Sequence, residues 1–443
     1  MKRTIYLLFV GLFGATILMS PSCKTEKDGP APVKDVFNNG TSERNLIVVM
    51  SDMHLGADLA YAECKENLPA LEKLLHQIKA SNNVKELVIA GDLLDEWFVP
   101  ATINTYQGKD QGDFVQRIAA TNKGVFNVLN NIIQEKKILL TYVPGNHDLT
   151  ITESSVELIL PGINQARDPE LSLGTYSPAG FPQIAIEHGH RYNFFCAPDP
   201  FSNQDIAPGT ITPPGYFFTR IAALHVIQEN PPAGDTIHLV TPNSSGDESQ
   251  NLLFAYYKLW EWAINYLKIE NRFDEEIIVT NIDGFTGSYA VNDLLPFQST
   301  PGGFIDVKLY KGVQDSWEQR QTYNHVPVSI PAQQAITGSA SAELTDNQAK
   351  NQYFLNPDSD VKLVVFGHTH VPTIKASIDH LGQKTIYANS GTWIDHNTLD
   401  TVSAMNFVII TPQDIDTASQ TQVKLYSFKN EIIAEMAVDS LRL

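Results

Sequence analysis

Residues 140–150 read LTYVPGNHDLT, in which an apolar segment runs directly into three polar side chains, Asn146, His147 and Asp148. Gly145 and Asn146 are typical of a tight turn. A turn requires neither the histidine nor the aspartate that follow, and similar polar clusters end other apolar segments of the chain. The stretch therefore predicts a strand whose carboxyl end carries functional side chains.

Apolar strands and helical patterns alternate along the chain up to this stretch. Strands are predicted at 45–50, 86–90 and 137–143, with helices at 68–80 and 114–134 between them. Continuous apolar strands that alternate with helices are typical of a sheet covered on both faces. The first part of the chain therefore indicates an α/β fold.

More strands are predicted later in the chain. They lie at 183–187, 362–366, 384–393, 405–411 and 421–428. The last three follow one another with turn signals between them. We expect this last part of the chain to form a strand-rich second sheet.

The stretch 201–354 does not follow this pattern. It is rich in Pro, Gly and Asn, and it contains two predicted helices at 217–227 and 252–268. We expect an insertion that lies over one end of the core and selects the substrate. An aromatic stripe in its second helix is more typical of a core than of a ligand platform. Arg220 in its first helix is more typical of a surface salt bridge than of a phosphate ligand.

Size and composition exclude several classes of protein. A chain of 443 residues with 43% hydrophobic and 18% charged residues can bury a large core and is not of the disordered type. A net charge of −19 without a basic run argues against a nucleic acid backbone as partner. No segment indicates an obligate protein partner.

Residues 1–22 predict a signal peptide. Basic residues precede an apolar stretch at 5–19, which is shorter than the roughly 20 residues of a membrane-spanning helix. Small residues then precede Cys23, and this arrangement resembles a bacterial lipoprotein signal in which the cysteine is lipidated. Ser20 stands where leucine is commonest in such signals, so an ordinary secretory signal is the alternative.

Both alternatives place the mature chain outside the cytoplasm. The lipoprotein alternative attaches it to a membrane of the bacterial cell envelope through a lipid anchor, in the periplasm or on the outer surface. Residues 23–44 then form a flexible tether. The remaining cysteines, Cys64 and Cys196, follow polar clusters of the chain and could pair in this oxidising compartment, so a disulfide between them is one hypothesis and two free thiols are the other.

Five polar clusters follow predicted strands. Loops at one end of an open α/β sheet are where such folds bind ligands, so we expect these side chains to converge. The clusters supply Asp52, His54, Asp92, Asp95, Asn146, His147, Asp148, His188, His190, His368 and His370.

This mixture of side chains indicates a metal centre. Carboxylate and imidazole groups without thiolates suit divalent Mn, Fe or Zn. About seven convergent ligands exceed the four of one tetrahedral zinc ion, whereas two ions about 3.5–4 Å apart with a bridging carboxylate would use them all. Two such ions keep a positive charge after Asp52, Asp92 and a hydroxide are counted. The sequence therefore predicts a centre that attracts an anionic phosphate group.

The motifs D-x-H, G-D-x-x-D, G-N-H-D, H-G-H and G-H-x-H, in this order, resemble those of the calcineurin-like metallophosphoesterase superfamily. The resemblance covers about 45–200 and 355–395 and does not cover the insertion. It implies a four-layer α-β-β-α sandwich of two mixed sheets. The core is then formed by 45–200 and 355–443, with the insertion 201–354 before the last metal motif.

The resemblance implies seven metal ligands, of which Asp92 bridges the two ions. The first ion is then held by Asp52, His54 and His370, and the second by Asn146, His188 and His368.

Other residues are implied to act beside the ions. His147 would stabilise the phosphoryl group or protonate the leaving oxygen, while Asp148 orients its ring. Asp95 would fix a ligand imidazole. His190 and Arg191 would lie either behind the ligands or towards the substrate.

The resemblance implies a hydrolase in which a metal-bound hydroxide attacks a phosphomonoester, phosphodiester or pyrophosphate in line. The substrate would be a phosphorylated small molecule or a phospholipid-type molecule. The alternative function is an envelope lipoprotein that binds metal or phosphate without turnover.

Overall fold

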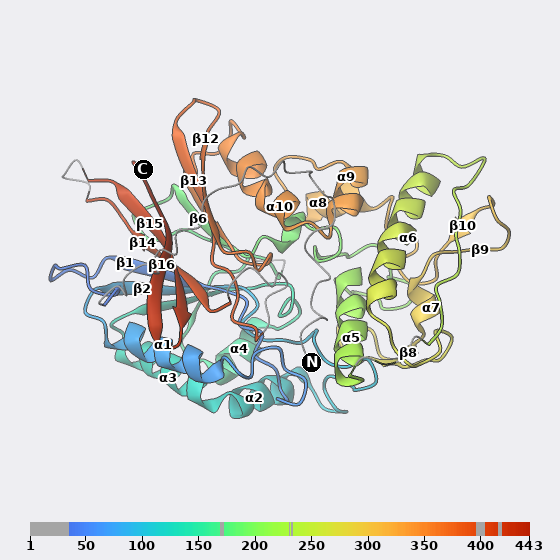
Figure 1. Cartoon of the computed structure of the whole chain (residues 1–443), viewed down its shortest axis with the longest axis horizontal. Coiled ribbons are helices and arrows are strands. Elements are labelled where there is room, and N and C mark those ends of the chain that lie inside the picture. The colour runs from blue at the N-terminus through green and yellow to red at the C-terminus, as the bar shows by residue number, and fades with distance from the viewer. Residues whose placement is uncertain (1–34, 169–171, 230, 232–233, 396–403, 415–418) are drawn as a thin grey trace, which may run out of the picture.

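The computed structural model describes most of the chain beyond residue 34 (Figure 1). The described residues are 35–168, 172–229, 231, 234–395, 404–414 and 419–443. The predicted signal peptide and its lipidation site Cys23 lie outside them. Within these ranges no helix combines the length and the apolar character needed to cross a membrane.

Residues 35–44 pack against the core. The side chain of Phe37 is buried, and its ring stacks on that of Phe407 with 5.8 Å between centroids. The carbonyl of Phe37 accepts a hydrogen bond from the Ser81 hydroxyl at 2.8 Å. The prediction of a flexible tether is therefore wrong for residues 35–44, because an aromatic side chain fixes them to the fold.

Seven strands form the first sheet, in the order β16-β15-β14-β1-β2-β3-β4. Its parallel part consists of β1 (Leu46–Met50), β2 (Val84–Ala90), β3 (Leu139–Val143) and β4 (Asn164–Gln165). Its antiparallel part consists of β14 (Asn406–Thr411), β15 (Thr421–Lys429) and β16 (Ile432–Leu441).

The C-terminal strands β14 and β15 join this first sheet, so their predicted assignment to a second sheet is wrong. β14 pairs antiparallel with β1. Alternate side chains of β14 enter the core beneath the helices and the core between the two sheets. A strand buried on both faces fits a central position in either sheet, and its sequence does not identify its partner.

Five strands form the second sheet, in the order β12-β13-β11-β6-β5. Its parallel centre consists of β6 (Ile184–Glu187), β11 (Leu363–Phe366) and β13 (Lys384–Asn389). Its antiparallel edges are β5 (Thr175–Tyr176) and β12 (Thr373–Ile378).

The two sheets face each other across an aliphatic core to which both contribute, for example through Val49, Val88 and Val365. Helices α1 (Leu68–Ala80), α2 (Gln111–Thr121), α3 (Lys123–Glu135) and α4 (Glu153–Ile159) cover the outer side of the first sheet (Figure 1). The outer layer of the second sheet is smaller and consists of α10 (Ala342–Asp346) and the π-helix η2 (Ala349–Phe354). The expected α-β-β-α sandwich of two mixed sheets is confirmed.

The single helix predicted at 114–134 is divided into α2 and α3 at Asn122. The Asn122 side-chain amide donates hydrogen bonds to the carbonyls of Gly56 and Ile118, both at 2.9 Å. Because Gly56 lies in the loop that follows β1, this side chain connects the helix junction to that loop. The break depends on a contact between distant segments, which the helical spacing of 114–134 does not reveal.

The insertion contributes no described strand to either large sheet and lies beside them in Figure 1. Its helices beside the sheets are α5 (Pro214–Ile227), α6 (Glu248–Tyr266), α7 (Val291–Leu294), α8 (Trp317–Tyr323) and α9 (Ala332–Gly338). The last residues of 201–354 form α10 and η2, which belong to the outer layer of the second sheet. Its strand pairs are β7 (Ile278–Val279) with β8 (Ser288–Tyr289), and β9 (Phe297–Gln298) with β10 (Ile305–Asp306). In α6, Tyr257 and Trp260 are fully buried, which confirms that the aromatic stripe is mainly core.

Candidate metal centre

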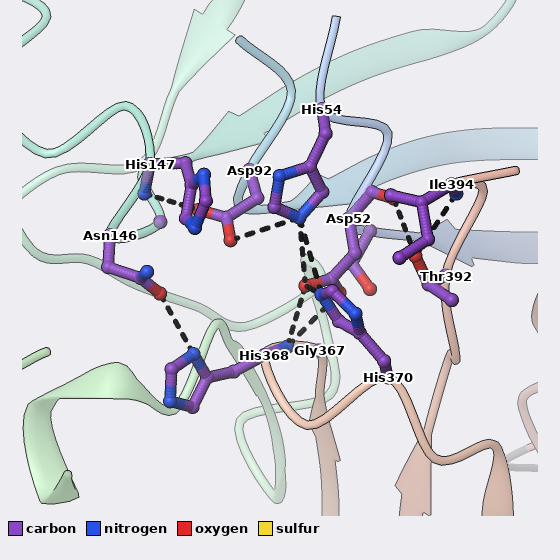
Figure 2. A network of polar contacts seen from close by, with 12 residues as sticks. Asp52, His54, Asp92, Asn146, His147, Gly367, His368, His370, Thr392 and Ile394 are labelled. Carbon is purple, nitrogen blue, oxygen red and sulfur yellow. Dashed lines mark hydrogen bonds and ion pairs between the residues drawn. The ribbon is translucent and has the colours of Figure 1, made fainter. Parts of the chain in front are cut away.

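The predicted ligands come together from the carboxyl ends of strands in both sheets (Figure 2). β1, β2 and β3 of the first sheet lead into Asp52 and His54, Asp92, and Asn146, respectively. β6 and β11 of the second sheet lead into His188 and into His368 and His370.

One group of ligand atoms surrounds the predicted first ion position. His370 Nε2 lies 3.1 Å from Asp52 Oδ1 and 3.3 Å from His54 Nε2. Asp92 Oδ2 lies 3.6 Å from His54 Nε2 on the other side of this group. These three separations are those of neighbouring ligands around one ion, because bonds of about 2.0–2.2 Å place neighbouring ligands about 3 Å apart.

A second group surrounds the predicted second ion position. His188 Nε2 lies 3.1 Å from Asp92 Oδ2 and 3.0 Å from Asn146 Oδ1, which in turn is 2.8 Å from His368 Nδ1. The same Asp92 oxygen thus contacts a histidine of each group. This is the position that a bridging carboxylate requires.

The hydrogen bonding of His188 tests whether a cation fits between these atoms. Its Nδ1 lies 2.8 Å from the carbonyl of Ala90, which can only accept, so Nδ1 carries a proton. In the neutral ring, Nε2 then carries a lone pair and can only accept a hydrogen bond. It faces two other acceptors, the side-chain oxygens of Asp92 and Asn146. Acceptors this close repel one another unless a positive charge lies among them. The donor set therefore fits divalent ions.

The pKa of His188 reflects the same requirement for positive charge. Burial lowers this pKa, but the carboxylates of Asp92 and Asp52 more than offset the effect and raise it to about 9. The two buried carboxylates thus stabilise the positive charge of the protonated ring. Divalent ions would supply that charge and displace the proton.

The backbone of the predicted ligands is strained. Five of them have positive φ angles, an uncommon conformation that costs on the order of 1–3 kcal/mol for each residue. They are Asp52 (53°), His54 (46°), Asp92 (51°), His368 (66°) and His370 (59°). Hydrogen bonds between the loops hold this conformation, such as those from the amide of His54 to the carbonyl of Asp92 (2.9 Å) and from the amide of His368 to Asp52 Oδ1 (3.1 Å). The ligands are therefore positioned in advance.

Two glycines allow these loops to approach one another. A Cβ atom at Gly145 would lie 2.1 Å from Asp92 Oδ1, and one at Gly367 would lie 2.5 Å from Asp52 Oδ2. Both distances are far below van der Waals contact. The glycine that opens the G-N-H-D motif and the one that opens G-H-x-H are thus required by the space that ligand carboxylates occupy.

His147 lies beside the ligand groups, and Asp95 holds its ring. His147 Nδ1 is 2.8 Å from Asp95 Oδ1, while Asp95 Oδ2 is 3.2 Å from Nδ1 of the ligand His54. The ring of His147 also packs on the indole of Trp97, with 5.1 Å between centroids. Burial lowers the pKa of His147, but Asp95 outweighs this effect and the pKa is raised. Asp95 fixes a ligand imidazole as expected, and it orients His147 as well.

The prediction that Asp148 orients His147 is wrong. The Asp148 carboxylate accepts hydrogen bonds from the backbone amides of Gly145 (2.6 Å), Leu93 (2.9 Å) and Leu94 (3.2 Å). A fully buried carboxylate needs such donors, and these are supplied by the backbone of its own turn and of the loop after β2. Asp148 therefore connects two ligand-bearing loops.

His190 and Arg191 lie behind the ligands, in the short helix η1 (His190–Tyr192). The His190 ring is buried 5.3 Å from that of His188, and neither of its nitrogens has a hydrogen-bond partner among the described residues. Arg191 Nε forms an ion pair with Glu187 Oε2 at 2.8 Å. Neither residue lines the pocket that leads to the centre, so the alternative in which they face the substrate is not supported.

Cys64 and Cys196 are both buried and free, which favours the alternative of two free thiols over the disulfide. The Cys196 sulfur lies beside Gly215 of α5, whereas Cys64 follows Glu63 in the loop after β1. Proximity in sequence to ligand residues did not imply that the two side chains face each other. Burial raises the pKa of both thiols, which keeps them protonated and unreactive.

Sequence reasoning missed two residues of the centre. Glu63 Oε2 lies 3.1 Å from Nδ1 of His54, and nothing in its local sequence indicates this contact. Trp97 lies two residues after Asp95 in the stretch AGDLLDEW, so its position in a ligand-bearing loop was the available signal. Both residues line the pocket in front of the centre.

Arg220 is fully buried, which corrects its assignment to a surface salt bridge. Its guanidinium donates to the carbonyls of Val99 (2.6 Å) and Val279 (2.9 Å). These bonds fasten the segment after Trp97 to α5. Arg220 therefore positions one wall of the centre and is not available to a phosphate group.

A two-sheet α/β fold with Asp, Asn and His ligands at facing strand ends defines a class of metal-binding phosphoesterase. The family model of the calcineurin-like phosphoesterases matches residues 46–269, which is just over half of the chain. The chain therefore belongs to the calcineurin-like phosphoesterase family.

Other comparisons give little further detail. The crystal structure of Pseudomonas putida nuclease MPE is similar over 35% of this chain, with 17% sequence identity and a TM-score of 0.20. The chain spans 56% of that protein. No protein of curated function matches the sequence.

Proposed function

We propose that this protein is a phosphate-ester hydrolase that depends on two divalent metal ions. The observation that carries the proposal is that one Asp92 oxygen lies within 3.6 Å of ligand nitrogens from two separate groups. The first ion would be held by Asp52, His54 and His370, and the second by Asn146, His188 and His368, with Asp92 shared. Ions of the Mn, Fe or Zn type suit these oxygen and nitrogen ligands.

The ions, when bound, supply positive charge to the phosphoryl oxygens and lower the pKa of a water molecule to near neutrality. The protein's own part is to fix the geometry of the ligands. Strained backbone conformations and hydrogen bonds between the loops already hold Asp52, His54 and Asp92 in place. Little reorganisation is then needed when the ester binds.

His147 would give a proton to the leaving oxygen of the ester. The Asp95 carboxylate accepts the Nδ1 proton, so Nε2 is the ring atom that can exchange a proton with a substrate. The raised pKa of His147 shifts the ring towards its protonated form. His147 lines the pocket, as this role requires.

Metal analysis combined with turnover tests the proposal. Purified protein should contain about two divalent ions per chain and should hydrolyse p-nitrophenyl phosphate or its diester in a manner that a chelator abolishes. Asp92→Asn should lose both metal and turnover. Asp113→Asn, which changes an aspartate in a surface ion pair with Lys109, should lose neither. Protein with neither bound metal nor metal-dependent turnover would overturn the proposal and leave the silent binding protein as the alternative.

A further inference from the structure

A pocket of about 140 Å³ extends from the candidate metal centre towards helix α5 of the insertion. Asp92, Asn146 and His147 line the end at the centre. The insertion lines the other end. It contributes the apolar side chains of Phe218, Ala222, Val226, Leu267 and Ala342, and the hydroxyl-bearing side chains of Thr219, Ser339, Ser341 and Thr345. An ester held at the centre would place its organic group at this end.

One face of α5 forms the apolar wall. Phe218, Ala222 and Val226 all line the pocket, and their spacing of four residues places them on the same side of the helix. Leu267, which follows α6, adds a further apolar side chain. The opposite side of α5 is buried in the insertion, so the orientation of this face is fixed by packing.

The pocket lacks cationic side chains. None of the described residues that line it is a lysine or an arginine, and Glu63 adds a carboxylate beside the centre. Arg220, on the same helix, is occupied by backbone carbonyls, and Arg191 is paired with Glu187. Apart from the His147 ring, the metal ions would therefore be the only positive charge that the described lining offers a substrate. A second phosphate or a carboxylate on the substrate would lose its hydration without gaining a partner.

We propose, building on the hydrolase function, that the substrate is a phosphate ester of an uncharged, apolar alcohol whose organic group lies against α5. A cavity of roughly 150 Å³ with apolar walls can hold a benzene ring, so the pocket suits a compact aromatic or branched aliphatic group. In the reaction a water molecule releases one proton to the solvent, its oxygen forms a bond to phosphorus, and the ester P–O bond breaks. The alkoxide takes a proton from His147 and leaves as the apolar alcohol, and His147 regains a proton from the solvent.

A series of alkyl phosphates tests this specificity. Hydrolysis of ethyl, propyl and butyl phosphate should show kcat/KM rising about fourfold for each methylene group that enters the pocket, because the leaving alcohols are of similar acidity. Glycerol phosphate, with hydroxyls in place of apolar surface, should be a poorer substrate than butyl phosphate. Equal kcat/KM for all of these esters would overturn the apolar specificity and leave the hydrolase function intact.

Substitutions on α5 test where the organic group binds. Ala222→Phe should fill the pocket and lower kcat/KM for benzyl phosphate at least about tenfold more than for methyl phosphate. Ile227→Phe introduces the same ring at an exposed position near the end of α5 that does not line the pocket, and it should leave the ratio unchanged. If the two variants give the same ratio of kcat/KM values, the organic group does not lie against α5.

A charge substitution gives a gain of function. Val226→Arg should improve kcat/KM for propane-1,3-diol bisphosphate relative to butyl phosphate, because the new cation pairs with the second phosphate. Ile227→Arg introduces the same charge outside the pocket and should not change this relative preference. An equal improvement in both variants would indicate general attraction of anions and would contradict the proposal.

Binding separates a failure of this proposal from a failure of the hydrolase function. Calorimetry with metal-loaded protein should show benzylphosphonate binding at least about tenfold more tightly than methylphosphonate, since an apolar ring buries more surface. A preference for benzylphosphonate without any turnover would support the apolar site and overturn the hydrolase function. Equal binding of the two phosphonates would overturn the apolar site, whatever the turnover.

Discussion

At the scale of single residues, the carboxylate of Asp95 connects the candidate metal centre to His147, the proposed proton donor. Its two oxygens contact the Nδ1 atoms of His54 and His147. One side chain therefore fixes the tautomers of His54, a predicted metal ligand, and of His147. The nearby Asp148 instead accepts hydrogen bonds from the backbone amides of Gly145, Leu93 and Leu94.

Asp95→Asn should change both the metal affinity and the pKa of His147. Metal affinity should fall about 10–100-fold, because His54 loses a partner that orients it. The pKa of His147 should fall, so the decline in kcat with rising pH should begin at lower pH. Metal titration and a kcat–pH profile measure these effects. Asp148→Asn is the control and should lower stability without moving the profile. An unmoved profile in Asp95→Asn would exclude Asp95 as the partner of His147.

Glu96 should make folding stability depend on pH. Burial raises its pKa from 4.5 to about 7, and hydrogen bonds from the hydroxyls of Thr150 and Tyr106 offset this only in part. The native state thus keeps a proton that the unfolded state releases above pH 4.5. The stabilisation is complete below that pH and is lost as the pH rises through about 7, by roughly 3 kcal/mol.

Glu96→Gln removes this titration. The free energy of unfolding of the variant, relative to the parent, should rise by roughly 3 kcal/mol between pH 4 and pH 8. Urea unfolding at several pH values measures the difference, with Glu66→Gln, at an exposed site, as the control. A difference that stays constant with pH would mean that Glu96 titrates normally.

At the scale of elements, periodicity predicted most helices and strands, and it failed where distant contacts decide. The predicted helix 68–80 coincides with α1. The division of 114–134 at Asn122 depends on a carbonyl 66 residues away, and the partner of β14 depends on which edge of β1 is free. Local sequence contains neither fact. The edge strands β4, β5, β12 and β16 were missed for a similar reason, since partly exposed edge strands have weak apolar patterns.

Asn122→Ala should loosen the loop after β1. Loss of hydrogen bonds to Gly56 and Ile118 should cost about 1–2 kcal/mol and should lower metal affinity, because the same loop carries Asp52 and His54. Asn130→Ala is a matched control, since its amide also donates to two carbonyls, those of Phe126 and Ile159, away from the centre.

Urea unfolding and metal titration distinguish these two asparagines. Both variants should lose similar stability, and only Asn122→Ala should lose metal affinity. Equal metal affinity in the two variants would show that the helix junction does not position the ligands.

At the scale of the whole molecule, the insertion shares one hydrophobic core with the sandwich. Phe194 and Phe195, which follow β6, pack against Tyr256 and Trp260 of α6 and against Trp317 of α8. The position of this stretch as an insertion could be predicted from composition. Its continuity with the core could not, because that depends on which aromatic side chains meet.

Deletion of residues 205–350 should therefore prevent folding of the remaining chain. The deletion would expose several large aromatic side chains at once, and such apolar patches promote aggregation. Expression followed by sedimentation should find the shortened chain in the insoluble fraction. A soluble, folded product with unchanged hydrolysis of small aryl phosphates would show that the sandwich is independent of the insertion.

The candidate site was largely predictable because its ligands occur in short motifs after strands. Asp52, Asp92 and His188 were identifiable from these motifs, and the structure brings them together. Glu63 and the apolar face of α5 carry no local signature and required the fold. That Asp95 contacts His147 in place of Asp148 likewise depends on the direction of the side chains, which a motif does not specify.

The convergence of ligands from two sheets has a mechanical consequence. Each ion would bind ligands from both sheets of the sandwich. The two ions would therefore link the two sheets at the ends of their strands. Metal binding and folding would then be coupled. Each tenfold rise in free metal concentration above the dissociation constant would raise the free energy of unfolding by about 1.4 kcal/mol for each site. Loss of metal in the cell would therefore lower the stability of the protein as well as its proposed activity.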